Sequence, residues 1–296
     1  EQHTLHQLCA TMGRAYSLHT PLALPTALRR GLNTVDHPHR AGPFYLLMPM
    51  NTQPSPLPGF NLDEQPPGAP PGGPGGAPGG APPRLGAASG ADRYAQAAEA
   101  LARAERVVVK VGGGARQAGP ELLVFLELAD AVAVLSPRIS GLVPYDHPRN
   151  MTVGGSKGSI SGNYAMEHAD LLVAIGTRFV CQSDCSRTGY PGVQAVININ
   201  ADPEAVMHYG RTIPLLGDAG PTLRLLTEAL NEARRRRAVR SSSSPSPWMA
   251  DCSAQRHAWE AFKAERYRTP TLYDEAWQGE VLTQPAAIKV AADWAW

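Results

Sequence analysis

The stretch Arg106–Gly114, RVVVKVGGG, decides the fold: a short apolar run stops on three consecutive glycines. Four valines among its first six residues are typical of a strand that is buried on both faces, as in parallel sheets. Three glycines let the backbone turn tightly and approach a ligand that a Cβ atom would exclude. We therefore predict that a nucleotide-binding-type α/β domain is organised around this strand.

Alternating strand and helix patterns continue from this stretch for about a hundred residues. Five apolar runs separated by helical patterns predict a doubly wound parallel sheet, which is a Rossmann-like α/β fold. A helix before the first strand is expected to begin with Asp92 as its N-cap, and Asp202 before Pro203 is typical of another helix opening. The long segment 137–158 is predicted to be a loop. The predicted strands are 107–111, 131–135, 170–176, 194–200 and 213–216, and the predicted helices are 91–104, 120–130, 159–168 and 221–237.

Composition excludes several classes of protein. The net charge of +1 gives no general attraction to nucleic acid or to acidic membranes, and no apolar run approaches a membrane span. Four arginines at 234–237 are best explained as a solvated helix end, where positive charge suits the helix dipole. The four cysteines are scattered, which is typical of reduced thiols in a cytoplasmic protein. Cys181 and Cys185 have a spacing that could serve a metal, but no other ligands complete a set.

Two linkers divide the chain. Residues 54–90 are rich in proline and glycine, contain almost nothing apolar to bury, and are predicted to be disordered. Residues 238–247 form a shorter serine- and proline-rich linker. Before the first linker, Pro21–Asn33 predicts an amphipathic helix and Ala41–Met50 predicts one buried strand. One strand cannot make a sheet, so we expect these elements to pair with something missing from this chain or to dock elsewhere.

The residues that follow the predicted strands are the candidates for binding, because parallel sheets bind ligands beyond the carboxyl ends of their strands. Glycines there permit close approach, an arginine can pair with phosphate, and Asn or Asp can accept hydrogen bonds from a ribose. The glycines could equally serve only to turn the chain, since GGGARQAG does not match the dinucleotide fingerprint. The candidates are Gly112–Gly114, Gly176–Arg178, Asn200, Asp202, Gly217 and Asp218.

Catalytic residues are not evident in the sequence. His147 and His168 have no neighbouring cysteine or serine that would form a nucleophile pair, and both are expected to be polar residues of surface segments. We find no paired carboxylates that would serve as general acid and base. The sequence therefore assigns no catalytic and no metal-binding residue in this chain.

Seven segments nevertheless resemble, in the same order, thiamine diphosphate-dependent enzymes of the acetolactate synthase type. AGPFYLLMPMNTQ resembles the end of the family's pyrimidine-binding domain, and RVVVKVGGGARQAGPELLVFLELADAVAVLS resembles the start of its central domain. DHP, GSKGSISGNYAMEHADLLVAIGTRF, VININADP and LLGDA follow within that domain. VLTQPAAIKVAADWA then resembles the entry into the pyrophosphate-binding domain.

The resemblance implies a domain organisation and an activity. Residues 1–53 would be the C-terminal remnant of the pyrimidine-binding domain, 91–237 the central Rossmann-like domain, and 248–296 the start of the pyrophosphate-binding domain. Such enzymes are lyases or transferases that use thiamine diphosphate and Mg²⁺ on a 2-oxo acid-type substrate, commonly as homodimers or homotetramers. The family's catalytic glutamate and its metal-binding segment are absent from this sequence, so we expect the chain to be inactive alone.

The central domain of different relatives binds FAD, binds an ADP-containing ligand, or binds nothing. By resemblance, seven residues match positions that contact FAD: Gly112, Gly113, Gly114, Arg178, Asn200, Gly217 and Asp218. Asn200 stands where FAD-binding members often carry an acidic residue, and Gly155–Gly158 lacks a histidine that is frequent there. The alternative is therefore a non-catalytic nucleotide-binding or subunit-assembly module. A free-standing NAD-dependent enzyme is disfavoured by the missing fingerprint.

Overall fold

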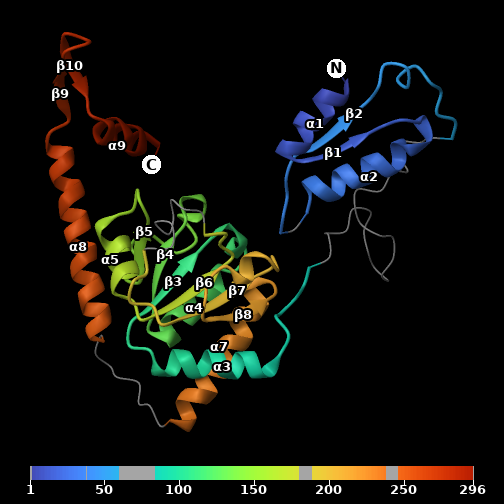
Figure 1. Cartoon of the computed structure of the whole chain (residues 1–296). Helices are drawn as coiled ribbons and strands as arrows, with labels where there is room; N and C mark the ends of the chain where they lie inside the picture. Colours follow the sequence, from blue (N-terminus) through green and yellow to red (C-terminus); the bar gives the residue numbers. More distant parts are fainter. Residues whose placement is uncertain (1, 38, 60–83, 180–188, 238–245, 296) are drawn as a thin grey trace. The chain divides into compact units, whose positions relative to one another are not determined.

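A computed structural model describes residues 2–37, 39–59, 84–179, 189–237 and 246–295 (Figure 1). The chain divides into two compact units, residues 1–85 and 86–296. The predicted linker at 54–90 and the pair Cys181 and Cys185 lie largely or wholly outside the described residues.

The first unit contains a two-stranded parallel sheet with helices. The predicted strand forms as β2 (Phe44–Leu47), and its partner is β1 (Arg14–Ser17), which pairs with it in the register Arg14↔Phe44. The sequence did not predict β1 or the helix before it. The predicted helix forms after a short 3₁₀ turn, because Pro21 and Pro25 stand where a missing N–H costs nothing. The helices of this unit are α1 (Gln2–Met12) and α2 (Leu24–Val35).

The second unit is built on a six-stranded, wholly parallel sheet in the order β5-β4-β3-β6-β7-β8. The predicted α/β fold class with a doubly wound parallel sheet is therefore confirmed. Its strands are β3 (Val107–Val111), β4 (Val132–Leu135), β5 (Asn150–Val153), β6 (Leu171–Ile175), β7 (Ala195–Asn200) and β8 (Thr212–Leu216). Its helices are α3 (Ala91–Arg103), α4 (Gly119–Ala129), α5 (Ile160–His168) and α7 (Ala219–Arg236).

Three local predictions are wrong. Segment 137–158 is not only a loop, since β5 lies within it and pairs with β4 at the edge of the sheet. Asp92 is not the N-cap of α3, because the chain enters this helix through Gly90 at φ +99°. Asp202 opens no α-helix, and only a 3₁₀ turn forms at Ala205–Met207.

Side chains from the two faces of the sheet form two cores, because successive residues of a strand point to opposite faces. One core joins alternate strand residues such as Val107 and Val109 to α3, α4 and α7, and the other joins Val108 and Leu172 to α5 and α8. The helices therefore lie in two layers around the sheet (Figure 1). Because the helices cover the two faces of the sheet, a binding site would lie at the ends of the strands.

The C-terminal segment begins with α8 (Pro247–Arg268), whose first turns pack on the second core through Trp248, Met249 and Cys252. Ser246 caps this helix by accepting a hydrogen bond from the Met249 N–H. An antiparallel hairpin of β9 (Thr271–Asp274) and β10 (Gly279–Leu282) and then α9 (Gln284–Ala295) follow. The hairpin was not predicted.

Candidate functional site

The carboxyl edge of the sheet gathers most of the predicted binding residues. From β3 the chain proceeds to β4 and β5 on one side, and then to β6, β7 and β8 on the other. Strand order therefore reverses between β3 and β6, and this is the point where open α/β sheets bind their ligands. The glycines after β3, the turn after β6 and Asn200 at the end of β7 all lie at this edge.

The turns after β3 and β6 are joined by hydrogen bonds between their backbones. The Gly112 N–H donates to the Ile175 carbonyl at 2.8 Å, and the Gly114 N–H donates to the Gly176 carbonyl at 3.0 Å. A Cβ atom on Gly112 would lie 2.4 Å from the Gly176 oxygen, and one on Gly114 would lie 2.8 Å from Gly176 Cα. These two glycines are therefore required for backbone packing, whether or not a ligand binds beside them. Gly113 differs, since a Cβ there would meet nothing within 4 Å.

Asn200 is buried and its amide is engaged on both sides. Its Nδ2 donates to the Thr177 carbonyl at 2.9 Å, and its Oδ1 accepts from the Asp202 N–H at 3.1 Å. The side chain thereby joins the loops that follow β6 and β7. These two bonds use one of the two N–H groups and one of the two acceptor sites of the amide, so they fix its orientation.

Gly217 and Asp218 connect the end of β8 to the segment that precedes α3. Asp218 Oδ2 accepts from the Gly86 N–H at 2.8 Å, and the Asp218 N–H donates to the Gly86 carbonyl at 2.7 Å. A Cβ atom on Gly217 would lie 2.4 Å from the Ala88 nitrogen. Both residues therefore join the end of β8 to the start of the second unit, across a sequence separation of 132 residues.

Arg178 has the opposite character, because its side chain is exposed and forms no hydrogen bond or ion pair within the described residues. The next residue, Phe179, is buried at φ +49° and stacks on His208 with ring centroids 5.7 Å apart. The predicted site residues thus divide into two groups: open positions at Gly113 and Arg178, and engaged positions elsewhere. That these residues bind a dinucleotide stays a prediction.

The two histidines singled out in the sequence have local partners. His147 Nε2 lies 3.8 Å from Glu127 Oε1, and His168 lies against Tyr164 with ring centroids 4.1 Å apart. No group of three or more His, Cys, Asp or Glu residues that could hold a metal occurs among the described residues. None of the helices described is long and apolar enough to cross a bilayer.

Sequence reasoning missed two polar residues inside the sheet. Lys110 of β3 is 1% exposed, and Asn198 of β7 is fully buried. They lie in one row across the sheet, because Lys110 and Asn198 both pair with Ala174 of β6. Asn198 Nδ2 donates to the Ala205 carbonyl at 2.9 Å. The available signal was a polar residue within an otherwise apolar strand.

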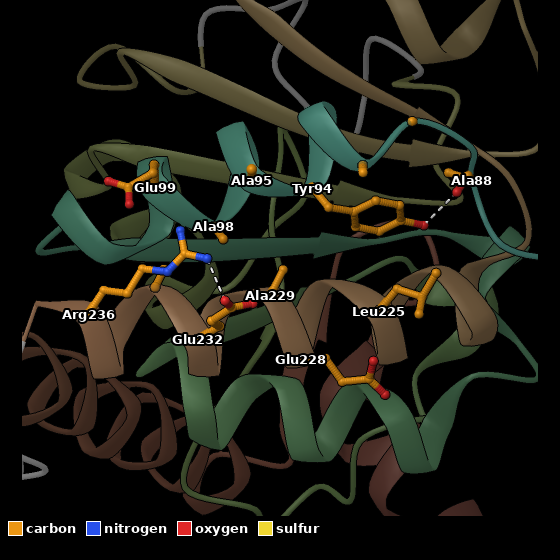
Figure 2. A pocket seen from close by; sticks show the side chains of 13 residues that line it. Ala88, Tyr94, Ala95, Ala98, Glu99, Leu225, Glu228, Ala229, Glu232 and Arg236 are labelled. Carbon is orange, nitrogen blue, oxygen red and sulfur yellow. Dashed lines mark hydrogen bonds and ion pairs between the residues drawn. The ribbon is translucent and has the colours of Figure 1, made fainter.

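A groove of about 520 Å³ lies elsewhere, between α3 and α7 (Figure 2). Alanines and Tyr94 form most of its floor, with Glu99, Glu228 and Glu232 around it. Burial raises the pKa of Tyr94, whose hydroxyl donates to the Ala88 carbonyl at 2.9 Å. No predicted binding residue lines this groove. It therefore gives no support to a nucleotide site at the strand ends.

Comparisons with known proteins agree with this architecture. Residues 94–226 match the family model described as the thiamine pyrophosphate enzyme central domain. The acetolactate synthase large subunit of Buchnera aphidicola is 29% identical over 143 residues, which cover 47% of this chain and 25% of the relative. A probable acetolactate synthase large subunit of Methanocaldococcus jannaschii is 33% identical over 138 residues, covering 46% and 23%.

A third relative carries a different name. The 3D-(3,5/4)-trihydroxycyclohexane-1,2-dione hydrolase of Lacticaseibacillus casei is 29% identical over 202 residues, which cover 67% of this chain and 29% of the relative. The aligned part thus spans between 23% and 29% of the length of these three relatives. The resemblance found in the sequence is confirmed to this extent: residues 94–226 match the thiamine pyrophosphate enzyme central domain, and the chain is similar to acetolactate synthase large subunits.

Proposed function

We propose that this chain is part of a thiamine diphosphate- and Mg²⁺-dependent lyase or transferase that acts on a 2-oxo acid-type substrate. The observation that carries the proposal is the match of residues 94–226 to the central-domain family, on a sheet whose topology is that of a doubly wound domain. The relative named as a dione hydrolase extends the candidate substrates to other activated ketones. We place the enzyme in the cytoplasm as a homodimer or homotetramer.

Within that enzyme, we assign the central domain a scaffolding role. Asn200 and Asp218 direct their polar atoms at neighbouring loops of the same domain, and Gly112 and Gly114 pack against Gly176. These contacts hold the carboxyl edge of the sheet together without a ligand. The domain can therefore serve as a rigid support for the segments on either side of it.

We also propose that the chain by itself binds thiamine diphosphate and Mg²⁺ only weakly and is inactive. Mg²⁺ is held by several oxygen ligands, and the described residues contain no acidic or histidine cluster of that kind. Isothermal titration of the chain with thiamine diphosphate in excess Mg²⁺ should give no saturable heat. An acetolactate synthase large subunit titrated in parallel shows that the assay detects binding, and stoichiometric tight binding by this chain would refute the proposal.

The activity itself is tested on the product of the full reading frame that contains this sequence. We expect decarboxylation of a 2-oxo acid, or its ligation to a second carbonyl compound, that requires both thiamine diphosphate and Mg²⁺. The proposal fails if this frame encodes neither the cofactor-ionising glutamate nor the metal-binding segment of the family. In that case the chain would be an assembly module.

The alternative function is non-catalytic binding of FAD or ADP, or subunit assembly. The observation in its favour is that Gly113 and Arg178 are open at the carboxyl edge of the sheet. Reconstitution with FAD followed by gel filtration separates the possibilities. A stable yellow complex that is lost in Arg178→Ala would support a flavin site, and colourless protein would support the scaffold.

A further inference from the structure

Helix α8 contacts the rest of the second unit in two places, one apolar and one polar. Its buried residues, Trp248, Met249 and Cys252, all lie in its first two turns. A helix of 22 residues is about 33 Å long, so most of α8 extends beyond this apolar contact. Beyond Cys252, the helix needs another contact to keep a fixed direction relative to the sheet.

That contact is made by Tyr145, which lies between β4 and β5. Its hydroxyl donates to Glu260 Oε1 at 2.6 Å and accepts from Arg256 Nη1 at 3.2 Å and from the Lys263 ammonium. One donor and two acceptor sites are all that a phenolic hydroxyl has. The Tyr145 hydroxyl is therefore saturated by three side chains of one helix.

The ring and backbone of Tyr145 are engaged as well. The Arg256 guanidinium carbon lies 4.2 Å from the ring centroid, and Lys263 Nζ lies 4.7 Å from it. Arg256 Nη2 also donates to the Tyr145 carbonyl at 3.0 Å. Spacings of four and three residues place Arg256, Glu260 and Lys263 on one face of α8. Glu260 forms ion pairs with both cations, so the four residues make a connected network.

The loop that carries Tyr145 is itself firmly attached to the sheet. Asn150 Nδ2 donates to the Val143 and Pro144 carbonyls at 3.0 Å each. Arg149 forms ion pairs with Glu127 and Asp130, both at 3.1 Å. Tyr145 is therefore presented from a fixed loop that starts at the carboxyl end of β4.

We propose that Tyr145, Arg256, Glu260 and Lys263, here called the Tyr145 clamp, form a joint that fixes the direction in which α8 leads to the C-terminal segment 271–295. The clamp connects the loop between β4 and β5 to the helix that precedes that segment. Tyr145 is a positioning residue in this proposal. The inference needs no catalytic activity of the chain, so it can fail while the proposed function stands.

Hydrogen–deuterium exchange of the intact chain tests the clamp. In Tyr145→Ala, amides of residues 256–268 should exchange about three- to tenfold faster, because cation–π and exposed ion-pair contacts are individually modest. Tyr145→Phe keeps the ring and should give a smaller increase. Residues 247–253 and strands β3 and β6 should keep their protection.

Glu265→Gln is the matched control, since it breaks the 2.9 Å ion pair with Arg268 on the same helix without touching the loop. It should leave exchange in residues 256–264 unchanged. Unchanged exchange across 256–268 in Tyr145→Ala would overturn the proposal. A uniform loss of protection that includes β3 and β6 would overturn it too, because Tyr145 would then stabilise the whole domain rather than the joint.

Discussion

Asn200 Nδ2 donates a 2.9 Å hydrogen bond to the Thr177 carbonyl, and this bond joins the ends of two neighbouring parallel strands. The acceptor is a backbone oxygen, so the residue at position 200 must supply a donor. An acidic residue at this position would have no such donor when it is ionised. The amide therefore serves the fold of this chain in a way that a carboxylate could not.

Asn200→Asp should lower the free energy of unfolding by about 1–3 kcal/mol, because a buried carbonyl loses its donor and faces a negative charge. Urea unfolding followed by circular dichroism measures the change. Asn231→Asp on the exposed face of α7 is the matched control and should stay within about 0.5 kcal/mol of the wild type. Equal losses in the two variants would contradict the role assigned to Asn200.

The glycines after β3 should respond very differently to the same substitution. Gly112→Ala places a methyl group 2.4 Å from the Gly176 carbonyl oxygen, so we expect a loss of about 1–3 kcal/mol, typical of overpacking. Gly113→Ala places a methyl group in open space and should be neutral or stabilise by up to about 1 kcal/mol. The urea unfolding midpoints of the two variants measure this difference. Equal midpoints would show that the close backbone packing at Gly112 does not contribute to stability.

The buried strands could be predicted from the sequence, because a parallel sheet covered on both faces requires continuous apolar runs. Val107–Val111 and Leu171–Ile175 are such runs, and both are fully buried. β5 was missed because Asn150 and Thr152 interrupt its pattern, and its pairing with β4 compensates for weak intrinsic preference. The hairpin β9–β10 was missed for a related reason: its residues are mostly exposed, so they carry no apolar signal.

The candidate site could be predicted only as residue types at strand ends. The sequence places Asp218 after β8, but not the Gly86 N–H that occupies its carboxylate from 132 residues away. It likewise places Tyr145 in a polar loop. It does not show that side chains of α8, more than a hundred residues later in the sequence, contact this tyrosine. Tertiary contacts decide which polar atoms already have hydrogen-bond partners. The residue pattern of a single segment carries no information about those contacts.

The docking of α8 on the sheet gives a further prediction. Trp248 Nε1 donates to the Val107 carbonyl at 3.2 Å, and the side chain is 3% exposed. Trp248→Phe should lower the free energy of unfolding of the sheet domain by about 1–3 kcal/mol, because it removes this donor and leaves space in the core. Trp277→Phe, at a residue that is 80% exposed, is the control and should change little. Identical unfolding midpoints for the two variants would mean that α8 does not contribute to the stability of the sheet.

Cys252 supplies a prediction about pH. Burial, with smaller contributions from Asp251 and Asp130, raises the pKa of its thiol from 9.0 to about 12. The folded protein then keeps a proton that the unfolded chain releases above about pH 9, so stability from this group is complete at neutral pH and declines as pH rises toward 12. Wild type should therefore exceed Cys252→Ala in free energy of unfolding at pH 7, and its advantage should shrink above about pH 9 by at most about 1.4 kcal/mol per pH unit. Urea unfolding of both proteins at pH 7, 9.5 and 10.5 measures this advantage. The difference between the two free energies cancels the titration of the lysines and tyrosines that both proteins contain. A constant difference across these three values would contradict the raised pKa of the thiol, because the group would then ionise as readily in the folded protein as in the unfolded chain.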